Sequence, residues 1–467
     1  MKRAPGGKLY WSADKPAEAL GGAILLIAVA IAVGPVAAQT GAWVRLDDGP
    51  RRFGLRHDDV FFVHPDTGWV VNTGSEVFRT NDGGVSWEEQ VRGSLPGIGM
   101  RAFRSVGFAN SSKGWIGSLT FGSVLFETLD GGETWADITG RINGEIEPAG
   151  ICGISVVDAD HAFGVGRWTG PAVFVKTVDG GQTWQASSLE SLAGTLVDVH
   201  FFDENEGFAV GGTTADLGSS SNRAVVLHTS DGGQTWTRRH VSSGPTSEWG
   251  WKISFPSRLV GYVSIEYRNP RDAAKVLKTV DGGLTWGEVD IPGNDPYRGL
   301  QGVGFLTEEL GWVGGRGEVS QTVDGGSMWQ SYSNVDGRVN RFRVLVDSIA
   351  YAVGEYVYRF KVNLNGDSTG TIAPLAIEST YPQPASEGVT IRYHIDVEAS
   401  VTAEVLDATG RRILKFSSLE VVGPGTHELV WDGRTGAGAR AASGWYLVRL
   451  RAGERIAQGT IILVRTG

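Results

Sequence analysis

A nine-residue phrase occurs six times in this chain and constrains its fold more than any other feature. All six copies share the pattern Thr-x-Asp-Gly-Gly-x-(Ser/Thr/Met)-Trp. They run over Arg79–Trp87, Glu127–Trp135, Lys176–Trp184, His228–Trp236, Lys278–Trp286 and Gln321–Trp329. Successive aspartates lie about 43 to 52 positions apart, the span of one four-stranded blade of a β-propeller. The spacing therefore predicts an all-β propeller.

The residue types in this phrase suit a tight turn. Paired glycines adopt positive φ without steric cost, and the aspartate before them can accept hydrogen bonds from the turn's own amides. The tryptophan offers a large apolar surface to pack between neighbouring sheets. The phrase resembles the Asp-box, or BNR repeat, which is a structural motif at the rim of each blade. The resemblance implies a structural role for Asp82, Asp130, Asp179, Asp231, Asp281 and Asp324.

A second phrase precedes each box and occurs seven times, once more than the box. It reads as a short hairpin, as in Val303-Gly304-Phe305 followed by Gly311-Trp312-Val313-Gly314. The seventh copy, over 342–354, has neither a box nor an outer strand. Residues 42–46 read like the strand that follows a box, and they could complete the last blade and remove its exposed edge. We therefore expect seven blades over residues 41–362.

The propeller region as a whole is similar to the photosystem II stability and assembly factor family. Members of that family are seven-bladed lumenal or exported proteins with the same two-phrase repeat. The similarity lies in the repeat and includes no residue set that would assign a role in photosynthesis.

Residues 1–38 read as a signal peptide. Four basic residues, the last of them Lys15, flank or precede an apolar run from Ala23 to Val33, and Val36-Ala37-Ala38 offers a cleavage site. An uncleaved N-terminal anchor is the alternative. After removal of the segment, no membrane span is expected, and the rest of the chain is exported.

The composition excludes several classes of partner and cofactor. A formal charge of −10 and a pI near 5.4 argue against nucleic acid. The single cysteine, Cys152, excludes an internal disulfide and any cysteine-based metal cluster. No phosphate-binding loop or zinc-protease phrase is present, so we expect no cofactor and no metal.

Residues 363–374 are a polar linker, and residues 375–467 are expected to form a small Ig-like β-sandwich. Four phrases in that segment begin at Tyr381, Leu406, Gly425 and Ser443. They resemble the C-terminal sorting domain of type IX secretion cargo and the related Ig-like domain of flagellar hook-capping proteins. The resemblance implies contact with the secretion machinery and a place at the cell surface or in the medium. A plain accessory module, with the protein in the periplasm, is the alternative.

A ligand is expected on the face opposite the boxes, at loops that enter the first strand or join the second and third strands of a blade. Arginine beside aromatic residues suits a carboxylate, a sugar or an extended peptide. The candidate residues are Arg101, Arg104, Arg167, Trp168, Trp249, Trp251, Tyr267, Arg268, Tyr297, Arg298, Arg316 and Arg341.

Three functions are compatible with the chain. The first is a non-enzymatic exported module that binds a protein or a glycan. The second is a glycoside hydrolase, because Asp-boxes are frequent in sialidases, but the Arg-Ile-Pro phrase of those enzymes is absent and they are six-bladed. The third is a photosystem-type assembly factor, which would leave the sorting domain unexplained. No catalytic residue is expected, and we favour the binding module.

Overall fold

The computed structural model describes most of the chain after residue 40. The described residues are 41–51, 56–95, 99–167, 169–216, 219–244, 247–268, 274–291, 299–315, 317–335, 338–346, 349–362, 375–395, 398–407, 412–416, 421–436, 438–452 and 455–465. The expected signal peptide and linker lie outside them. Within these ranges, no helix is long and apolar enough to cross a membrane.

The described strands between Gly41 and Val362 form seven sheets, which are numbered here in chain order. Sheet 1 comprises β2 (Asp59–Phe62), β3 (Gly68–Asn72), β4 (Glu76–Thr80) and β5 (Glu88–Val91). Sheet 2 comprises β6 (Phe103–Phe108), β7 (Gly114–Ser118), β8 (Leu125–Thr128) and β9 (Ala136–Asp137). Sheet 3 comprises β11 (Gly153–Val156), β12 (Ala162–Gly166), β13 (Val173–Thr177) and β14 (Trp184–Ser188). A short 3-10 helix, η1 (Thr139–Arg141), leads to β10 (Ile142–Gly144), which pairs in parallel with β14.

The other four sheets continue the pattern. Sheet 4 comprises β15 (Thr195–Phe201), β16 (Gly207–Gly212), β17 (Ala224–Thr229) and β18 (Thr237–Val241). Sheet 5 comprises β19 (Glu248–Ser254), β20 (Gly261–Tyr267), β21 (Ala274–Thr279) and β22 (Gly287–Ile291). Sheet 6 comprises β23 (Leu300–Phe305), β24 (Gly311–Gly315), β25 (Val319–Thr322) and β26 (Gln330–Tyr332). Sheet 7 comprises β27 (Val339–Val346), β28 (Ile349–Gly354), β29 (Val357–Val362) and β1 (Gly41–Arg45).

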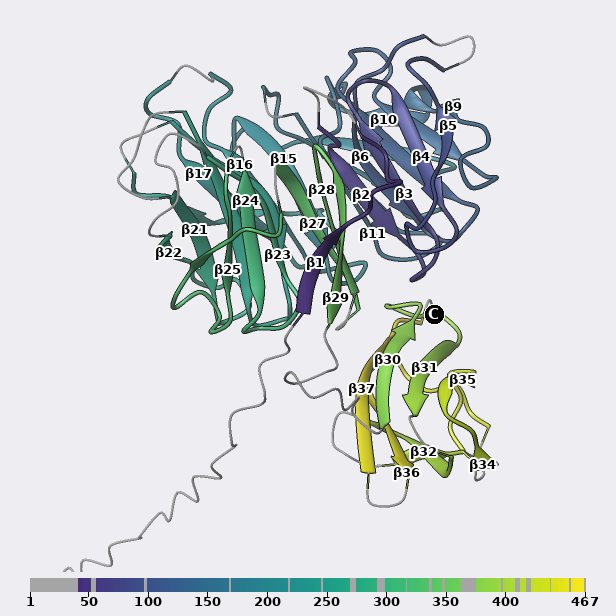
Figure 1. Ribbon diagram of the computed structural model, residues 1–467. Helices are drawn as coiled ribbons and strands as arrows, with labels where there is room; N and C mark the ends of the chain where they lie inside the picture. Colours follow the sequence, from purple (N-terminus) through teal and green to yellow (C-terminus); the bar gives the residue numbers. More distant parts are fainter. Residues whose placement is uncertain are drawn as a thin grey trace, which may run out of the picture. The chain divides into compact units, whose positions relative to one another are not determined.

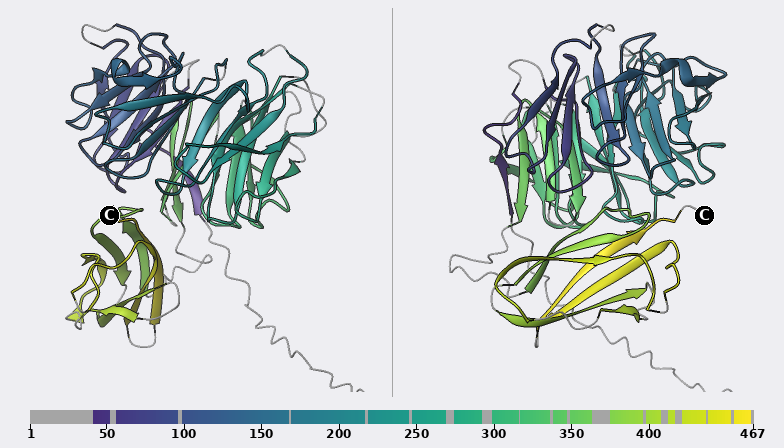
Figure 2. Two further views of the ribbon diagram at one scale, coloured as in Figure 1. Left: turned by 180° about the vertical axis from the view of Figure 1, so that it is seen from behind. Right: turned by 90° about the vertical axis from the view of Figure 1, so that its right-hand side faces the viewer.

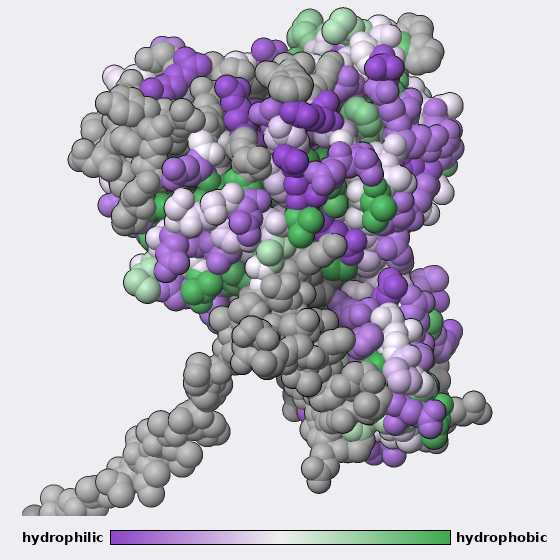
Figure 3. Space-filling model, in the orientation of Figure 1, coloured by the Kyte–Doolittle hydropathy of each residue, from purple (hydrophilic) through white to green (hydrophobic). Residues whose placement is uncertain are grey.

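The innermost strands of these sheets meet around a common axis. Each first strand contacts the first strand of the next sheet, and β27 of sheet 7 contacts β2 of sheet 1. Figures 1 and 2 show the sheets side by side with their strands roughly parallel to that axis. This arrangement is a β-propeller, as the repeat predicts. The outer surface in Figure 3 carries mostly polar side chains with scattered apolar ones.

The last sheet is completed by the start of the described chain. Strand β1 pairs antiparallel with β29, with Trp43 opposite Phe360. The buried Trp43 ring lies 5.5 Å from Phe342 of its own sheet and 5.1 Å from Trp312 of the preceding sheet, so it packs at the junction of the two sheets. The N-terminal strand therefore supplies the outer edge that sheet 7 lacks, as expected from the sequence.

Each box is a hydrogen-bonded turn that is also tied to its own sheet. In the fifth copy, Thr279 Oγ1 donates to Asp281 at 2.8 Å and accepts from the Gly283 amide, while Thr285 donates twice to Asp281. The Gly282 amide donates to the Leu259 carbonyl in the hairpin between the first two strands. The box turns and these hairpins therefore share one face, which we name the box face.

Aromatic side chains join consecutive sheets. Phe108 of sheet 2 stacks at 3.5 Å on Trp69 of sheet 1 and meets its own box tryptophan, Trp135, edge to face. Phe305 lies in the same way between Tyr262 of the preceding sheet and Trp329. The box tryptophan thus packs against the junction between sheets, which is the role its size predicts.

The C-terminal segment forms two facing sheets. One sheet comprises β30 (Leu375–Tyr381), β31 (Val389–Ile395) and β35 (Gly425–Trp431). The other comprises β33 (Arg412–Lys415), β32 (Ala399–Asp407), β36 (Gly444–Ala452) and β37 (Arg455–Leu463), and β34 (Val421–Val422) pairs with β32. Both sheets contribute to one core around Trp431 and Val405. Strand β30 has the burial pattern of a strand that is only partly covered, because its apolar residues do not alternate strictly.

Trp43→Ala should destabilise the protein by about 3–5 kcal/mol, because the substitution leaves a cavity at the closing junction. Val44→Ala on the same strand is the control, since Val44 is 39% exposed and should cost less than about 0.5 kcal/mol. Urea unfolding of both variants measures the difference. Equal losses of stability would show that the aromatic junction does not hold the ring closed.

Candidate binding site at the channel mouth

The candidate site lies on the face opposite the box face, which we name the mouth face. First strands begin there and second strands end there, because the hairpin that joins them lies on the box face. The connections between sheets and the loops between second and third strands therefore also reach the mouth face. This is the face on which the sequence places a ligand.

β-Bulges at the start of the first strands turn side chains toward the axis. The pairing register slips at Arg104 in β6, at Gln301 in β23 and at Asn340 in β27. In β19 it slips across Trp251 and Lys252. A bulge leaves an extra residue unpaired and re-aims its side chain. Four sheets thus direct polar or aromatic side chains into the channel, a feature that strand alternation in the sequence does not predict.

A pocket of about 250 Å³ opens at the channel mouth. Sheets 1, 2, 5 and 6 line it with three arginines, two tryptophans, two carboxylates and three smaller or neutral side chains. The lining residues are Arg56, Asp58, Thr73, Arg104, Leu119, Trp249, Trp251, Glu266, Arg268 and Gln301.

The arginines of this pocket are held by the carboxylates and by the tryptophan rings. Arg104 is 1% exposed, and its Nη1 donates to Asp58 at 2.6 Å. Arg56 Nε donates to the same carboxylate at 3.2 Å. The Arg104 guanidinium lies 5.2 Å from the centre of the Trp251 ring, and the exposed Arg268 lies 5.7 Å from that of Trp249. The pocket therefore presents fixed cations beside flat aromatic walls.

A buried ion-pair network fills the channel near this pocket. Arg341 of β27 forms a bidentate pair with Asp198 of β15, at 2.8 and 2.9 Å, and its Nε donates to Asp59 at 2.9 Å. Burial raises the pKa of Asp198, but Arg341 and Lys252 outweigh burial and hold that pKa at about 2. The network crosses sheets 1, 4, 5 and 7, so it fixes their first strands around the axis.

The predicted site residues divide into several groups. Arg104, Trp249, Trp251 and Arg268 line the pocket together. Arg101 and Arg167 are half-buried on the mouth face outside the pocket, and Arg167 Nη1 donates to the Ala149 carbonyl at 3.2 Å. Four of the predicted residues lie outside the described part of the chain, namely Trp168, Tyr297, Arg298 and Arg316.

Two placements differ from the expectation of exposed loop residues. Arg341 is 5% exposed on a strand, where the carboxylates of Asp198 and Asp59 hold it inside the channel. Tyr267 is the last residue of β20 and packs in the core between sheets 5 and 6. Both expectations were wrong because the first and second strands extend further toward the mouth than their apolar pattern indicates.

The expected site does not include four residues of the pocket, namely Arg56, Asp58, Glu266 and Gln301. It also lacks Asp198 and Lys252, although each stands within an apolar strand run. A charged residue in such a run must be paired once it is buried. That pattern was a usable signal for a polar channel.

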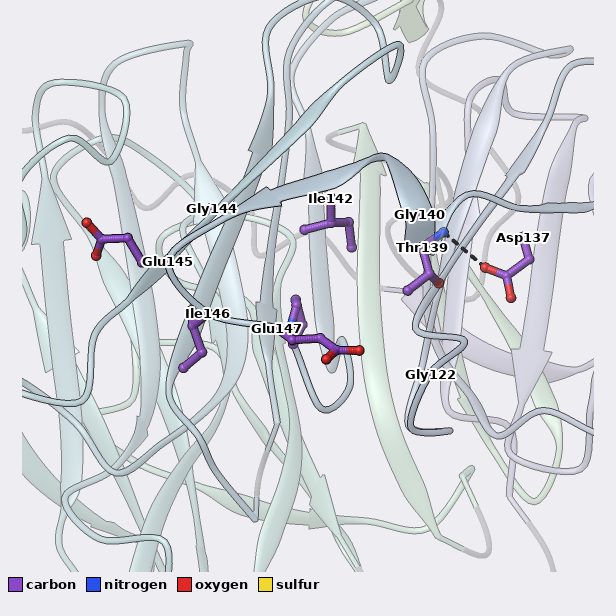
Figure 4. A pocket seen from close by; sticks show the side chains of 10 residues that line it. Gly122, Asp137, Thr139, Gly140, Ile142, Gly144, Glu145, Ile146 and Glu147 are labelled. Atoms are coloured by element: carbon purple, nitrogen blue, oxygen red, sulfur yellow. Dashed lines mark hydrogen bonds between the residues drawn. The ribbon is translucent and has the colours of Figure 1, made fainter.

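A second hollow of about 570 Å³ lies on the same face at the connection between β9 and β11. Figure 4 shows its side chains, with Ile142 and Ile146 between the Glu145 carboxylate on one side and Asp137 on the other. Asp137 accepts a hydrogen bond from the Thr139 amide at 3.0 Å. Leu119 of the mouth pocket and Gly122 of this hollow belong to the same loop between β7 and β8.

No tyrosine is among the described residues that line the mouth pocket, and Tyr267 is buried elsewhere. The Asp58 carboxylate is held by ion pairs with Arg56 and Arg104. The arrangement is suited to binding a ligand by charge and stacking.

The fold and the pocket define this protein as a β-propeller with a pocket at its axis and a C-terminal β-sandwich. Residues 50–162 match the family model described as "Photosynthesis system II assembly factor YCF48", and residues 383–455 match the FlgD Ig-like domain. No curated protein matches the chain.

Solved propellers share the fold at low sequence identity. A structure of YCF48 bound to D1 peptide is 19% identical, covers 70% of this chain and 97% of its own, and has a TM-score of 0.52. YCF48 from Cyanidioschyzon merolae is 18% identical over 68% of this chain and 99% of its own, with a TM-score of 0.51. PorZ, a surface component of the type-IX secretion system of Porphyromonas gingivalis, is 14% identical over 87% of this chain and 59% of its own, with a TM-score of 0.50. These similarities establish the fold.

Asp198→Asn should remove about 3–5 kcal/mol of stability at pH 7, because it leaves Arg341 without its bidentate partner. The folded pKa of Asp198 lies below its unfolded value, so the carboxylate stabilises the fold above about pH 4, and this contribution is lost as the pH falls toward 2. The difference in the free energy of unfolding between the wild type and Asp198→Asn should therefore become smaller in acid.

Denaturant unfolding at pH 7 and pH 3 measures that difference. The exposed Asp160→Asn is the control, and it should leave stability nearly unchanged at both pH values. A difference that is constant with pH would contradict the ionic role of Asp198.

Proposed function

We propose that this protein is a non-enzymatic binding module whose mouth pocket captures an extended segment of a partner protein. The observation that carries the proposal is the convergence of Arg56, Arg104 and Arg268 with Trp249 and Trp251 in one pocket. Arginine forks recognise carboxylates, and aromatic faces accept flat or apolar groups. The preferred segment therefore carries a carboxylate next to an aromatic or aliphatic side chain.

The similar structures support a protein partner. One is a complex of YCF48 with a D1 peptide, and another is a component of a secretion system. A glycan that carries a carboxylate is the alternative ligand, because the same arginines and rings would suit it. The match of residues 50–162 to the YCF48 family model also keeps an assembly-factor role open.

The sheets that surround the pocket suggest that it is held by a rigid scaffold. We infer that the seven sheets are the blades of a closed seven-bladed ring, with β1 and β29 joining the two ends of the propeller. Ligands of such a ring meet side chains held by several sheets at once, so little ordering is required on binding. This pre-organisation favours recognition over catalysis.

Export is the second part of the proposal. The N-terminal phrase of basic residues, apolar run and small residues suits a signal peptide over residues 1–38. The match of residues 383–455 to the FlgD Ig-like domain, and the phrases shared with type IX cargo, support delivery by a secretion machinery to the cell surface or medium. A protein without a working sorting domain would stay in the periplasm.

Arg268→Ala should weaken peptide binding about five- to tenfold, because it removes an exposed cation from the pocket rim without touching the core. Peptides selected from a random displayed library on the wild-type protein provide the ligand, and fluorescence anisotropy measures Kd. Arg440→Ala, an exposed arginine of the C-terminal domain, is the control and should bind as wild type does.

Selected peptides that bind both variants equally would place the site elsewhere and refute the mouth pocket. The same preparations are assayed with fluorogenic glycosides, including sialosides. Turnover that Arg268→Ala reduces would move the protein to the glycoside hydrolases and end the binding-module proposal.

A further inference from the structure

The channel network contains more cations than carboxylates. Its cations, all buried or half-buried, are Arg56, Arg104, Lys252, Arg341 and Arg343. The carboxylates that act on them, all buried, are Asp58, Asp59, Asp198 and Glu266. Among the described residues, five cations therefore face four carboxylates, and Lys252, Arg341, Asp59 and Asp198 are buried from water. One of these five cations has no carboxylate of its own within this set.

The unmatched charge lies at Lys252. Its ammonium is 0% exposed, and its one ion contact is with Asp198 Oδ1 at 3.8 Å. That oxygen already accepts a hydrogen bond from Arg341 Nη2 at 2.9 Å. Among the described residues, Lys252 Nζ has no hydrogen-bond partner, although an ammonium has three donors to satisfy.

Another orphan donor belongs to the same network. Arg104 Nη2 is buried without a partner, while its Nη1 is bound to Asp58. The charge of Arg104 acts on Lys252, so the two groups lie within electrostatic reach of each other. Trp251, the neighbour of Lys252 in β19, packs under the Arg104 guanidinium.

A buried ammonium without hydrogen bonds is strongly unfavourable. A buried water can accept its hydrogen bonds but cannot balance its charge, which leaves two ways to remove the excess charge. The group can lose its proton, and burial together with Arg341 does lower the pKa of Lys252 to about 7. At a lower pH the proton remains, and a small anion can supply both the missing charge and the missing acceptor. The excess charge and the orphan Nζ donors of Lys252 favour the anion.

We infer that the channel binds a small monovalent inorganic anion of about the size of chloride against Lys252 Nζ. Lys252 does not line the mouth pocket, so a carboxylate held at the mouth occupies a different place. The anion completes the charge balance of the network and stabilises the folded ring. This site is independent of the partner segment proposed above.

The test is thermal and urea unfolding at pH 6 in sodium chloride and in sodium gluconate of equal concentration, because gluconate is too large for a buried site. The folding equilibrium constant of the wild type should be about tenfold larger in chloride at ten times its Kd. Lys252→Met should abolish the difference between the salts. Lys275→Met removes a cation of the same sheet that pairs with Glu288 at 2.8 Å, and it should keep the difference.

Raising the pH to 9 should remove the chloride effect from the wild type, because Lys252 is then neutral. Diffraction from crystals grown in sodium bromide at pH 6 provides a measurement that does not depend on a variant, and an anomalous peak beside Lys252 Nζ is expected. Equal stability in both salts, a chloride effect retained by Lys252→Met, or a water in place of the anomalous peak would each overturn the anion site.

Discussion

The aromatic contact between consecutive sheets is the interaction on which the rest of the molecule depends. In sheets 1, 2, 4 and 6 a phenylalanine at the end of the first strand, such as Phe108, stacks on an aromatic ring of the preceding sheet and meets its own box tryptophan. A single four-stranded repeat cannot bury its apolar faces by itself. Packing each sheet against two neighbours supplies the missing burial, and closure by β1 extends it to the last sheet.

Closure of the ring creates the polar channel. First strands from all seven sheets converge on the axis, where their side chains have no apolar partner layer to meet. The charges of Asp198 and Arg341 are stable there because they come from different sheets and satisfy one another through two hydrogen bonds. The bulges that aim such residues inward also aim Arg104 and Trp251 toward the mouth. The β-bulges thus place the side chains that pair inside the channel and also the side chains that line the mouth pocket.

The two faces of the ring consequently differ in kind. On the box face, side-chain oxygens such as those of Asp281 accept hydrogen bonds from residues of their own turn. On the mouth face, Arg268 and the rings of Trp249 and Trp251 border an open pocket, and carboxylates surround the adjoining hollow near Glu145. A partner segment with separated charges would meet complementary groups across this face.

The sequence by itself determined the repeating unit. Thr279, Asp281 and the paired glycines interact within a few positions of one another, so their chemistry can be read from local spacing, and the closing role of Trp43 follows from its likeness to the box tryptophans. Four of the candidate residues that it selected line one pocket on the face opposite the boxes.

Only the tertiary structure decided which charges are buried. Arg341 and Asp198 are 143 positions apart, so no local pattern indicates that they pair. The β-bulge at Arg104 reverses the expected direction of a side chain, and the carboxylate that holds it, Asp58, comes from another sheet. Turns are fixed by neighbours along the chain, whereas a channel is fixed by strands that meet only when the ring closes.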